Sequence, residues 1–180
     1  FMSEKRIDET FAALSRERSL YGMHIAGGEA TLNWDRLLYA IRSAGRHGVG
    51  LEYLETNAHW CDDDETALAG FRELQAAGLN AVLISASMFH VEFIPLRKTK
   101  AAIRAAFEVF GRHNVLVWTP DVLQRMDQAL EDDRTYPLRK SAPLMGLDIE
   151  HGEVFHLHTY LRSGGRAAER LADGLSHYSP

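Results

Sequence analysis

The segment Ala81–Ser87, with the sequence AVLISAS, is an almost continuous apolar run whose polar residues come near its end. A short apolar run of this kind predicts a strand. The stretch before it, Asp62–Ala77, has a helical pattern that ends at Gly78, and the stretch after it, Lys98–Phe110, has another that ends at Gly111. A strand between two helices is the repeating unit of parallel sheets.

The same alternation extends in both directions from this strand. Further helices are predicted over Ser3–Arg18, Trp34–Arg46 and Asp121–Glu131, and further strands over Tyr21–Ala26, Leu51–Thr56 and Val115–Thr119. Strict alternation of strands and helices predicts parallel βαβ units with right-handed crossovers. Successive strands end about 30 residues apart, which fits a full or partial barrel and fits a doubly wound sheet equally well.

The pattern weakens after Asp132. Residues Asp133–Leu144 contain two prolines and mixed charge, and we expect a loop there. A further strand is predicted over Val154–Leu161, and a short helix from Gly164 and Gly165 through Leu175.

Composition limits the class of protein. The 180 residues suggest a single domain over 1–180, and the 46% apolar content is enough for a core. The formal net charge of −5 disfavours a nucleic-acid-binding protein, and no apolar run approaches the roughly 20 residues that span a bilayer. Cys61 is the one cysteine, so an internal disulfide or a multi-cysteine metal site is excluded, and we expect a reduced, cytoplasmic protein.

Polar residues follow the predicted strands where each apolar run stops. They are Gly27, Gly28, Glu29 and Thr31; Glu55, Thr56, Asn57 and His59; Ser85, Ser87 and His90; and Thr119, Pro120 and Asp121. Ligands of parallel sheets bind beyond the carboxyl ends of the strands, so these residues are candidates for one site. At any single strand the alternative is a tight turn followed by a helix cap.

Four stretches carry a family resemblance. They are HIAGGEATLN (His24–Asn33), EYLETNAHW (Glu52–Trp60), LISASMFHVEFIP (Leu83–Pro95) and VLVWTPD (Val115–Asp121). In this order and at this spacing they resemble the core of the radical S-adenosylmethionine superfamily, over roughly Met2–Asp121. The stretch Phe89–Pro95 is similar to iron–sulfur oxidoreductase-like members of that superfamily. The resemblance implies a partial (βα)6 TIM-like barrel of parallel strands that lacks its first strand.

The resemblance also implies a role for individual residues. Gly27, Gly28 and Glu29 would hold the ammonium group of S-adenosylmethionine, and Thr56 and Asn57 would lie beside that cofactor. Ser85, together with Ser87, would face its ribose. A basic residue after the same strand, the family's fourth, would meet its carboxylate; the candidates are Arg97 and Arg104.

The superfamily holds a four-iron four-sulfur cluster on a Cys-x3-Cys-x2-Cys motif, because soft thiolates bind such clusters. This chain has no such motif, and Ser3–Arg18 corresponds to the family's first helix. We therefore expect the motif before residue 1 of a longer parent. The parent would cleave S-adenosylmethionine reductively, with an electron donor, and abstract hydrogen from an unknown small-molecule or peptide substrate. The chain alone is expected to be inactive.

Two other functions remain open from the sequence. His24, His59, His90 and the pair His156 and His158 are candidates for a divalent-metal site of a TIM-like hydrolase, because imidazole suits zinc or iron. A non-catalytic interaction module is the other alternative. The acidic residues at 62–64 are better explained by the dipole at a helix start than by a metal.

The predicted strand Tyr21–Ala26 would be an unprotected edge if the family's first strand is missing. Exposed strand edges tend to pair with other chains. We therefore expect a homodimer through this edge, or a strand donated to it by a further segment of the chain, with no membrane or nucleic-acid partner.

Overall fold

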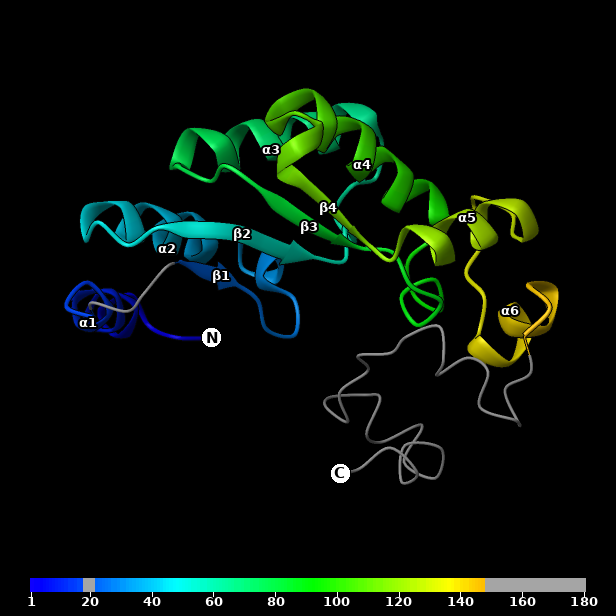
Figure 1. Ribbon diagram of the computed structural model, residues 1–180, viewed down its shortest axis with the longest axis horizontal. Coiled ribbons are helices and arrows are strands. Elements are labelled where there is room, and N and C mark those ends of the chain that lie inside the picture. The colour runs from blue at the N-terminus through cyan, green and yellow to red at the C-terminus, as the bar shows by residue number, and fades with distance from the viewer. Residues whose placement is uncertain (18–21, 148–180) are drawn as a thin grey trace, which may run out of the picture.

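The computed structural model describes residues 1–17 and 22–147 and contains a four-stranded, all-parallel sheet (Figure 1). The strands are β1 (Met23–Ile25), β2 (Leu51–Thr56), β3 (Val82–Ser85) and β4 (Val115–Trp118). Their order in the sheet is the order in the sequence, β1-β2-β3-β4. Because no strand is skipped, every connection between neighbours is a single crossover that carries a helix.

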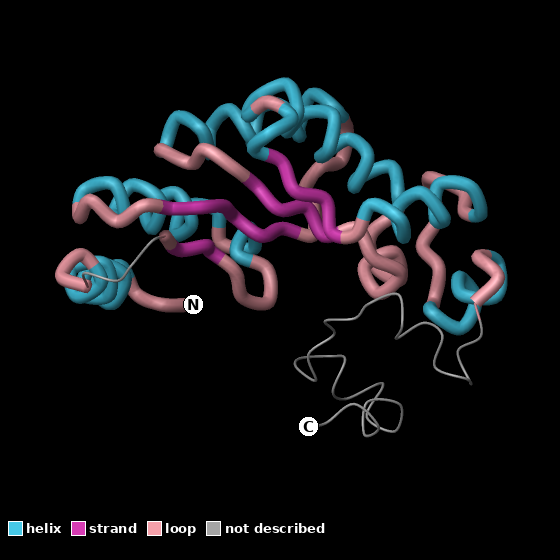
Figure 2. Tube along the Cα trace, in the orientation of Figure 1, coloured by secondary structure: helices cyan, strands magenta, loops and turns pink. Residues whose placement is uncertain are grey.

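The described part of the chain also contains six α-helices and two short 3₁₀ turns (Figure 2). The helices are α1 (Glu4–Leu14), α2 (Trp34–Arg46), α3 (Asp64–Ala77), α4 (Leu96–Phe110), α5 (Pro120–Ala129) and α6 (Leu138–Leu144). The 3₁₀ turns are η1 (Ala30–Leu32), before α2, and η2 (Arg112–Asn114), before β4.

Side-chain caps set the boundaries of the central helices. The Asn33 side chain accepts a hydrogen bond from the Arg36 amide at the start of α2, and the Asp63 side chain accepts one from Thr66 at the start of α3. Gly78 ends α3 with a φ of 116°, a left-handed value that favours glycine. Asp63 thus caps α3 and Asp64 lies in its first turn, so these acidic residues stand at a helix start, as the sequence predicted.

The core lies between one face of the sheet and helices α2, α3 and α4. Leu54 on β2 and Val82 and Ile84 on β3 are fully buried against these helices. The face of α4 in this core is lined by alanines, which let the helix approach the strands closely. They are Ala101, Ala102, Ala105 and Ala106.

Residues on the other face of the sheet alternate with these core residues. His24 stacks on Tyr53, with ring centroids 5.0 Å apart, and its Nε2 lies 3.4 Å from the Glu55 carboxylate. Leu116 and Trp118 on β4 are about half exposed, at 49% and 47%. Within the described residues the helices α2, α3 and α4 thus cover one face of the sheet only.

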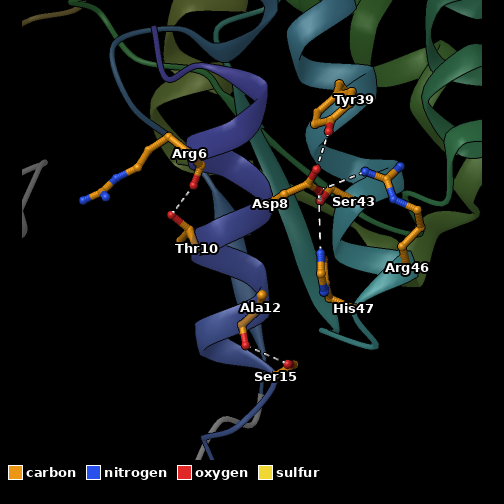
Figure 3. Close-up of polar contacts among 9 residues, drawn as sticks. All are labelled: Arg6, Asp8, Thr10, Ala12, Ser15, Tyr39, Ser43, Arg46 and His47. Atoms are coloured by element: carbon orange, nitrogen blue, oxygen red, sulfur yellow. Dashed lines mark hydrogen bonds and ion pairs between the residues drawn. The ribbon is translucent and has the colours of Figure 1, made fainter.

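Helix α1 packs on α2 through a small apolar cluster and a polar network centred on Asp8 (Figure 3). The Asp8 carboxylate accepts hydrogen bonds from the Tyr39 hydroxyl, at 2.5 Å, and from the buried Ser43 hydroxyl. Arg46 and His47 lie 3.0 and 3.6 Å from it. Met23 and Leu51 pack on the same apolar cluster, so α1 lies beside α2 and near the starts of β1 and β2.

Helices α5 and α6 form a second apolar cluster with the loop after β3. Its fully buried members include Met88, Val122 and Met126. Lys100 on α4 joins this part to the sheet layer through ion pairs with Asp127 and with Asp132, at 2.7 Å for the latter.

The alternation predicted from the sequence is confirmed up to α5, with element ends that move by a few residues. The prediction of a loop over Asp133–Leu144 is wrong in its second half, because α6 begins at Leu138. Its buried Leu138 and Ala142 pack on the second apolar cluster. The strand and helix predicted over Val154–Leu161 and 164–175 lie outside the described residues. No helix in the described ranges is long and apolar enough to cross a membrane.

Candidate functional site at the carboxyl ends of the strands

Glu29 lies just after β1 and joins the end of this strand to the end of β2. Its Oε1 accepts hydrogen bonds from the Thr31 amide (3.2 Å), the Thr31 hydroxyl (2.5 Å) and the Thr56 hydroxyl (3.0 Å). Its Oε2 accepts one from the Asn57 amide, at 2.7 Å. The predicted residues Glu29, Thr56 and Asn57 are therefore brought together, and Glu29 serves the protein's own donors.

Gly27 and Gly28 form the turn between β1 and Glu29, and both are exposed. Gly27 has a φ of 140°, which a side chain would strain. A Cβ built on either glycine would meet no protein atom within 4 Å. The Cβ positions of this turn therefore border open space.

Thr56 is buried, and its register partner on β3 is Ile84, which belongs to the core. Its hydroxyl donates to Glu29 and accepts from the Ala58 amide at 3.1 Å. The Asn57 side chain accepts from the His59 amide at 3.0 Å. Both residues thus shape the loop after β2, and Thr56 faces the helices.

Ser85 ends β3 on the opposite face of the sheet, level with Trp118 on β4. It is half-buried, and the described structure records no contact between Ser85 and the Glu29 cluster. Ser87 is nearly buried, and its hydroxyl lies 2.7 Å from Nδ1 of His90. The hydroxyl of Thr119, at the end of β4, is buried with no hydrogen-bond partner in the described part of the chain.

The two basic candidates are engaged in ion pairs on the helices. Arg97 donates to the Asp62 carbonyl and pairs with Asp133 at 3.1 Å. Arg104 pairs with Asp64 on α3, at 2.6 Å. The structure therefore does not bring either arginine into contact with Glu29, Asn57 or Ser85.

Lys98 is a residue of this region that the sequence interpretation did not identify. Its Nζ donates to the His59 carbonyl at 2.6 Å and pairs with the Asp62 carboxylate at 2.6 Å. The hydrogen bond from Lys98 lowers the pKa of Asp62. Lys98 belongs to no recognisable sequence motif. Its contacts with the loop after β2 follow from its position in the first turn of α4.

Cys61 is fully buried beside this loop. Burial raises the pKa of its thiol far above the ordinary value, and the nearby Lys98 offsets this only in part. A protonated, buried thiol is a poor nucleophile and a poor metal ligand. Cys61 therefore contributes to packing.

The histidines proposed as metal ligands have different partners. His24 pairs with Glu55, His59 with Thr31 and His90 with Ser87. Over residues 1–17 and 22–147, no group of three or more His, Cys, Asp or Glu side chains is arranged to hold a metal ion. His156 and His158 lie outside these ranges.

A separate open depression of about 620 Å³ lies between α5 and α6. Its lining includes Asp121, Gln124, Arg125 and Met145. None of the predicted cofactor-binding residues lines this depression, so it is distinct from the Glu29 cluster.

Comparison with known proteins gives no further assignment. No protein-family model matches this chain, and no curated protein matches it.

Proposed function

We propose that this chain is the S-adenosylmethionine-binding part of a radical S-adenosylmethionine enzyme, an oxidoreductase-like protein. One observation carries the proposal. The Glu29 carboxylate joins the Gly27–Gly28 turn after β1 to Thr56 and Asn57 after β2. Two separate motifs on which the family resemblance rests thus meet at one edge of the sheet, where ligands of parallel sheets bind.

The arrangement of the sheet supports a partial (βα)6 barrel as the setting of this site. Four parallel strands follow one another in sequence order, and α2, α3 and α4 pack on the same face. A doubly wound sheet reverses its strand order and places helices on both faces. The wall of a barrel has helices outside and side chains such as Tyr53, Glu55 and Trp118 inside.

The residues present fit the ammonium end of the cofactor. Backbone carbonyls of an exposed, glycine-lined turn can accept hydrogen bonds from an ammonium group. Oε2 of Glu29 has one donor among the described residues, the Asn57 amide, and a carboxylate oxygen can accept a second. Ser85 supplies a hydroxyl at the end of β3. The Thr119 hydroxyl, which has no hydrogen-bond partner among the described residues, lies just after β4.

The residues present do not fit the iron–sulfur cluster, because Cys61 is the one cysteine of the sequence and is buried with its thiol protonated. The cluster ligands must then come from outside these 180 residues. In the parent enzyme the cluster and an electron donor would supply the reductive chemistry, while Gly27, Gly28 and Glu29 of this chain would hold S-adenosylmethionine. The chain's own part is to hold the cofactor and exclude water.

Calorimetry with S-adenosylmethionine tests the proposal. We expect weak, saturable binding to the 180-residue chain, because the cluster is absent. Gly28→Val adds a side chain to the turn at a position where its Cβ would meet no protein atom within 4 Å. It should weaken binding at least tenfold, about 1.4 kcal/mol.

Gly50→Val is the matched control. Gly50 lies just before β2, at the opposite end of the sheet, and a Cβ there also meets no protein atom within 4 Å. Its binding should equal that of the wild type. Equal binding by Gly28→Val, or no saturable binding by the wild type, would contradict the proposal.

A further inference from the structure

The hydrogen bonds of Glu29 determine where the proton of the Thr31 hydroxyl lies. An ionised carboxylate only accepts hydrogen bonds. The Thr31 hydroxyl lies 2.5 Å from Oε1 of Glu29 and carries one proton. That proton therefore points to Glu29, and the hydroxyl oxygen is left to act as an acceptor toward its other neighbour.

The other neighbour is His59. Its Nδ1 lies 3.4 Å from the Thr31 hydroxyl oxygen. Because this oxygen has no second proton to give, the hydrogen bond requires a proton on Nδ1 of His59. In a neutral imidazole a proton on one nitrogen leaves the lone pair on the other. The chain from Glu29 through Thr31 thus fixes the Nδ1–H tautomer.

The backbone of His59 is held at both of its polar groups. Its amide donates to the Asn57 side chain at 3.0 Å, and its carbonyl accepts from Lys98 at 2.6 Å. The side chain is half-buried, and no described residue is recorded as a partner of Nε2. His59 is thus positioned by Asn57 and Lys98 at its backbone and by Thr31 at its ring.

We propose that Glu29 and Thr31 hold His59 as the Nδ1–H tautomer, so that Nε2 is a fixed hydrogen-bond acceptor for an O–H or N–H group of the ligand. His59 is then a ligand-positioning residue, and its lone pair selects ligands that present a donor to the loop after β2. The tautomer follows from the protein alone and does not depend on the proposed function. The proposed role of Nε2 in binding the ligand rests on that function.

Nitrogen-15 NMR of the histidine rings in the full chain tests the tautomer, at about pH 8.5, where imidazoles are neutral. His59→Gln assigns the signal. We expect an Nδ1–H pattern for His59 and no such bias for the exposed His113, which serves as an internal reference. An Nε2–H pattern for His59, or the mixture shown by His113, would overturn the proposal.

Variants of Thr31 distinguish the effect of the hydrogen bonds that link Glu29, Thr31 and His59 from a general packing effect. Thr31→Val removes the hydroxyl and should shift His59 to the pattern of His113, whereas Thr31→Ser should restore the Nδ1–H form. Circular dichroism confirms that each variant is folded. If Thr31→Val unfolds the chain, the Thr31→Ser and wild-type spectra still decide the tautomer.

Saturation with S-adenosylmethionine tests the proposed role of Nε2 in binding the ligand. The Nε2 signal of His59 should shift on binding in the wild type, and the shift should be lost in Thr31→Val. A saturated complex with an unchanged Nε2 signal overturns the ligand role of His59. If no S-adenosylmethionine binds, the proposed function is wrong, and the spectrum of the free protein still decides the tautomer of His59.

Discussion

At the scale of single residues, the carboxylates of Asp8 and Glu29 have the same structural role. Each joins two elements by accepting hydrogen bonds from hydroxyls, Asp8 between α1 and α2 and Glu29 between β1 and β2. The Ser43 hydrogen bond, followed by that of Tyr39, lowers the pKa of Asp8 well below its usual range. The hydrogen bond between Asp8 and Tyr39 also raises the pKa of the Tyr39 hydroxyl.

The lowered pKa of Asp8 predicts a pH dependence of stability. A carboxyl whose pKa is lower in the folded than in the unfolded state stabilises the fold at pH values above about 3.9. This contribution is lost as the pH falls toward the lowered folded value. We expect the melting temperature of the wild type to fall between about pH 5 and pH 2.5 more than that of Asp8→Asn.

Calorimetry across this pH range measures the difference between the two slopes. Glu17→Gln is the control, because Glu17 is exposed and has no recorded ion pair in the described structure. It should keep the wild-type slope. Parallel curves for the wild type and Asp8→Asn would show that Asp8 does not stabilise the contact between α1 and α2.

Cys61 gives a second residue-level prediction. Its thiol is fully buried, and burial raises its pKa far above the ordinary value. At about pH 8 the native protein should react with a disulfide reagent at least 100-fold more slowly than the protein in denaturant, because the thiolate is the reactive form. A native rate close to the denatured one would mean that Cys61 is accessible.

At the scale of elements, the central helices follow from sequence patterns and α6 does not. Helices α2 and α3 begin at Asn33 and Asp63 caps, which are visible in the sequence. Helix α6 has Pro137 at its start and Pro143 inside it. Its stability comes from burying Leu138 and Ala142 against residues that are distant in the sequence. Local helix propensity does not include such contacts, so it could not predict α6.

The candidate site shows the same limit. The sequence predicted that Glu29 and Asn57 lie close together, because both follow neighbouring parallel strands. The contact of Glu29 with Thr31 is local and caps the η1 turn. The sequence did not predict that Glu29 also accepts from Thr56, because this bond depends on the relative stagger of β1 and β2. That stagger includes an irregularity between Met23 and His24 that no local pattern shows.

Two glycines in helices have opposite surroundings and give a matched test of packing. A Cβ on Gly70 in α3 would lie 2.3 Å from the Trp60 ring, whereas a Cβ on Gly45 in α2 meets nothing within 4 Å. Gly70→Ala should destabilise the fold by about 1–3 kcal/mol through overpacking. Gly45→Ala should stabilise it by about 0.5–1 kcal/mol through helix propensity.

Urea denaturation measures both changes in the free energy of unfolding. The two substitutions are chemically identical, so a difference in sign isolates the effect of Trp60. If both variants gain stability, the Trp60 ring moves aside at little cost and the close packing between α3 and the loop after β2 is not rigid.

At the scale of the whole molecule, the sheet is asymmetric. One face is covered by α2, α3 and α4, and the edge strand β1 has three residues and pairs only with β2 in the described structure. The Met23 amide donates to Gly50, so alternation along the strand directs the amide of His24 to the open edge. This edge is the surface through which we expect a homodimer.

His24→Pro tests this edge, because proline has no amide proton to donate to a partner strand. His24→Ala is the matched control, since it removes the same ring contacts with Tyr53 and Glu55 and keeps the amide. In light scattering over a range of concentrations, the wild type and His24→Ala should dimerise and His24→Pro should remain monomeric. A monomeric wild type at high concentration would exclude the edge as a dimer interface.

The hydrogen bond from the Asn57 amide to Glu29 has a consequence for isotope exchange. This amide lies one residue beyond the end of β2, yet its acceptor belongs to the segment after β1. The amide proton of Asn57 should exchange with deuterium only when the two segments separate. Slow exchange at Asn57, lost in Glu29→Ala, would therefore report from a single loop position how often the first strand of the sheet detaches from the rest of the protein.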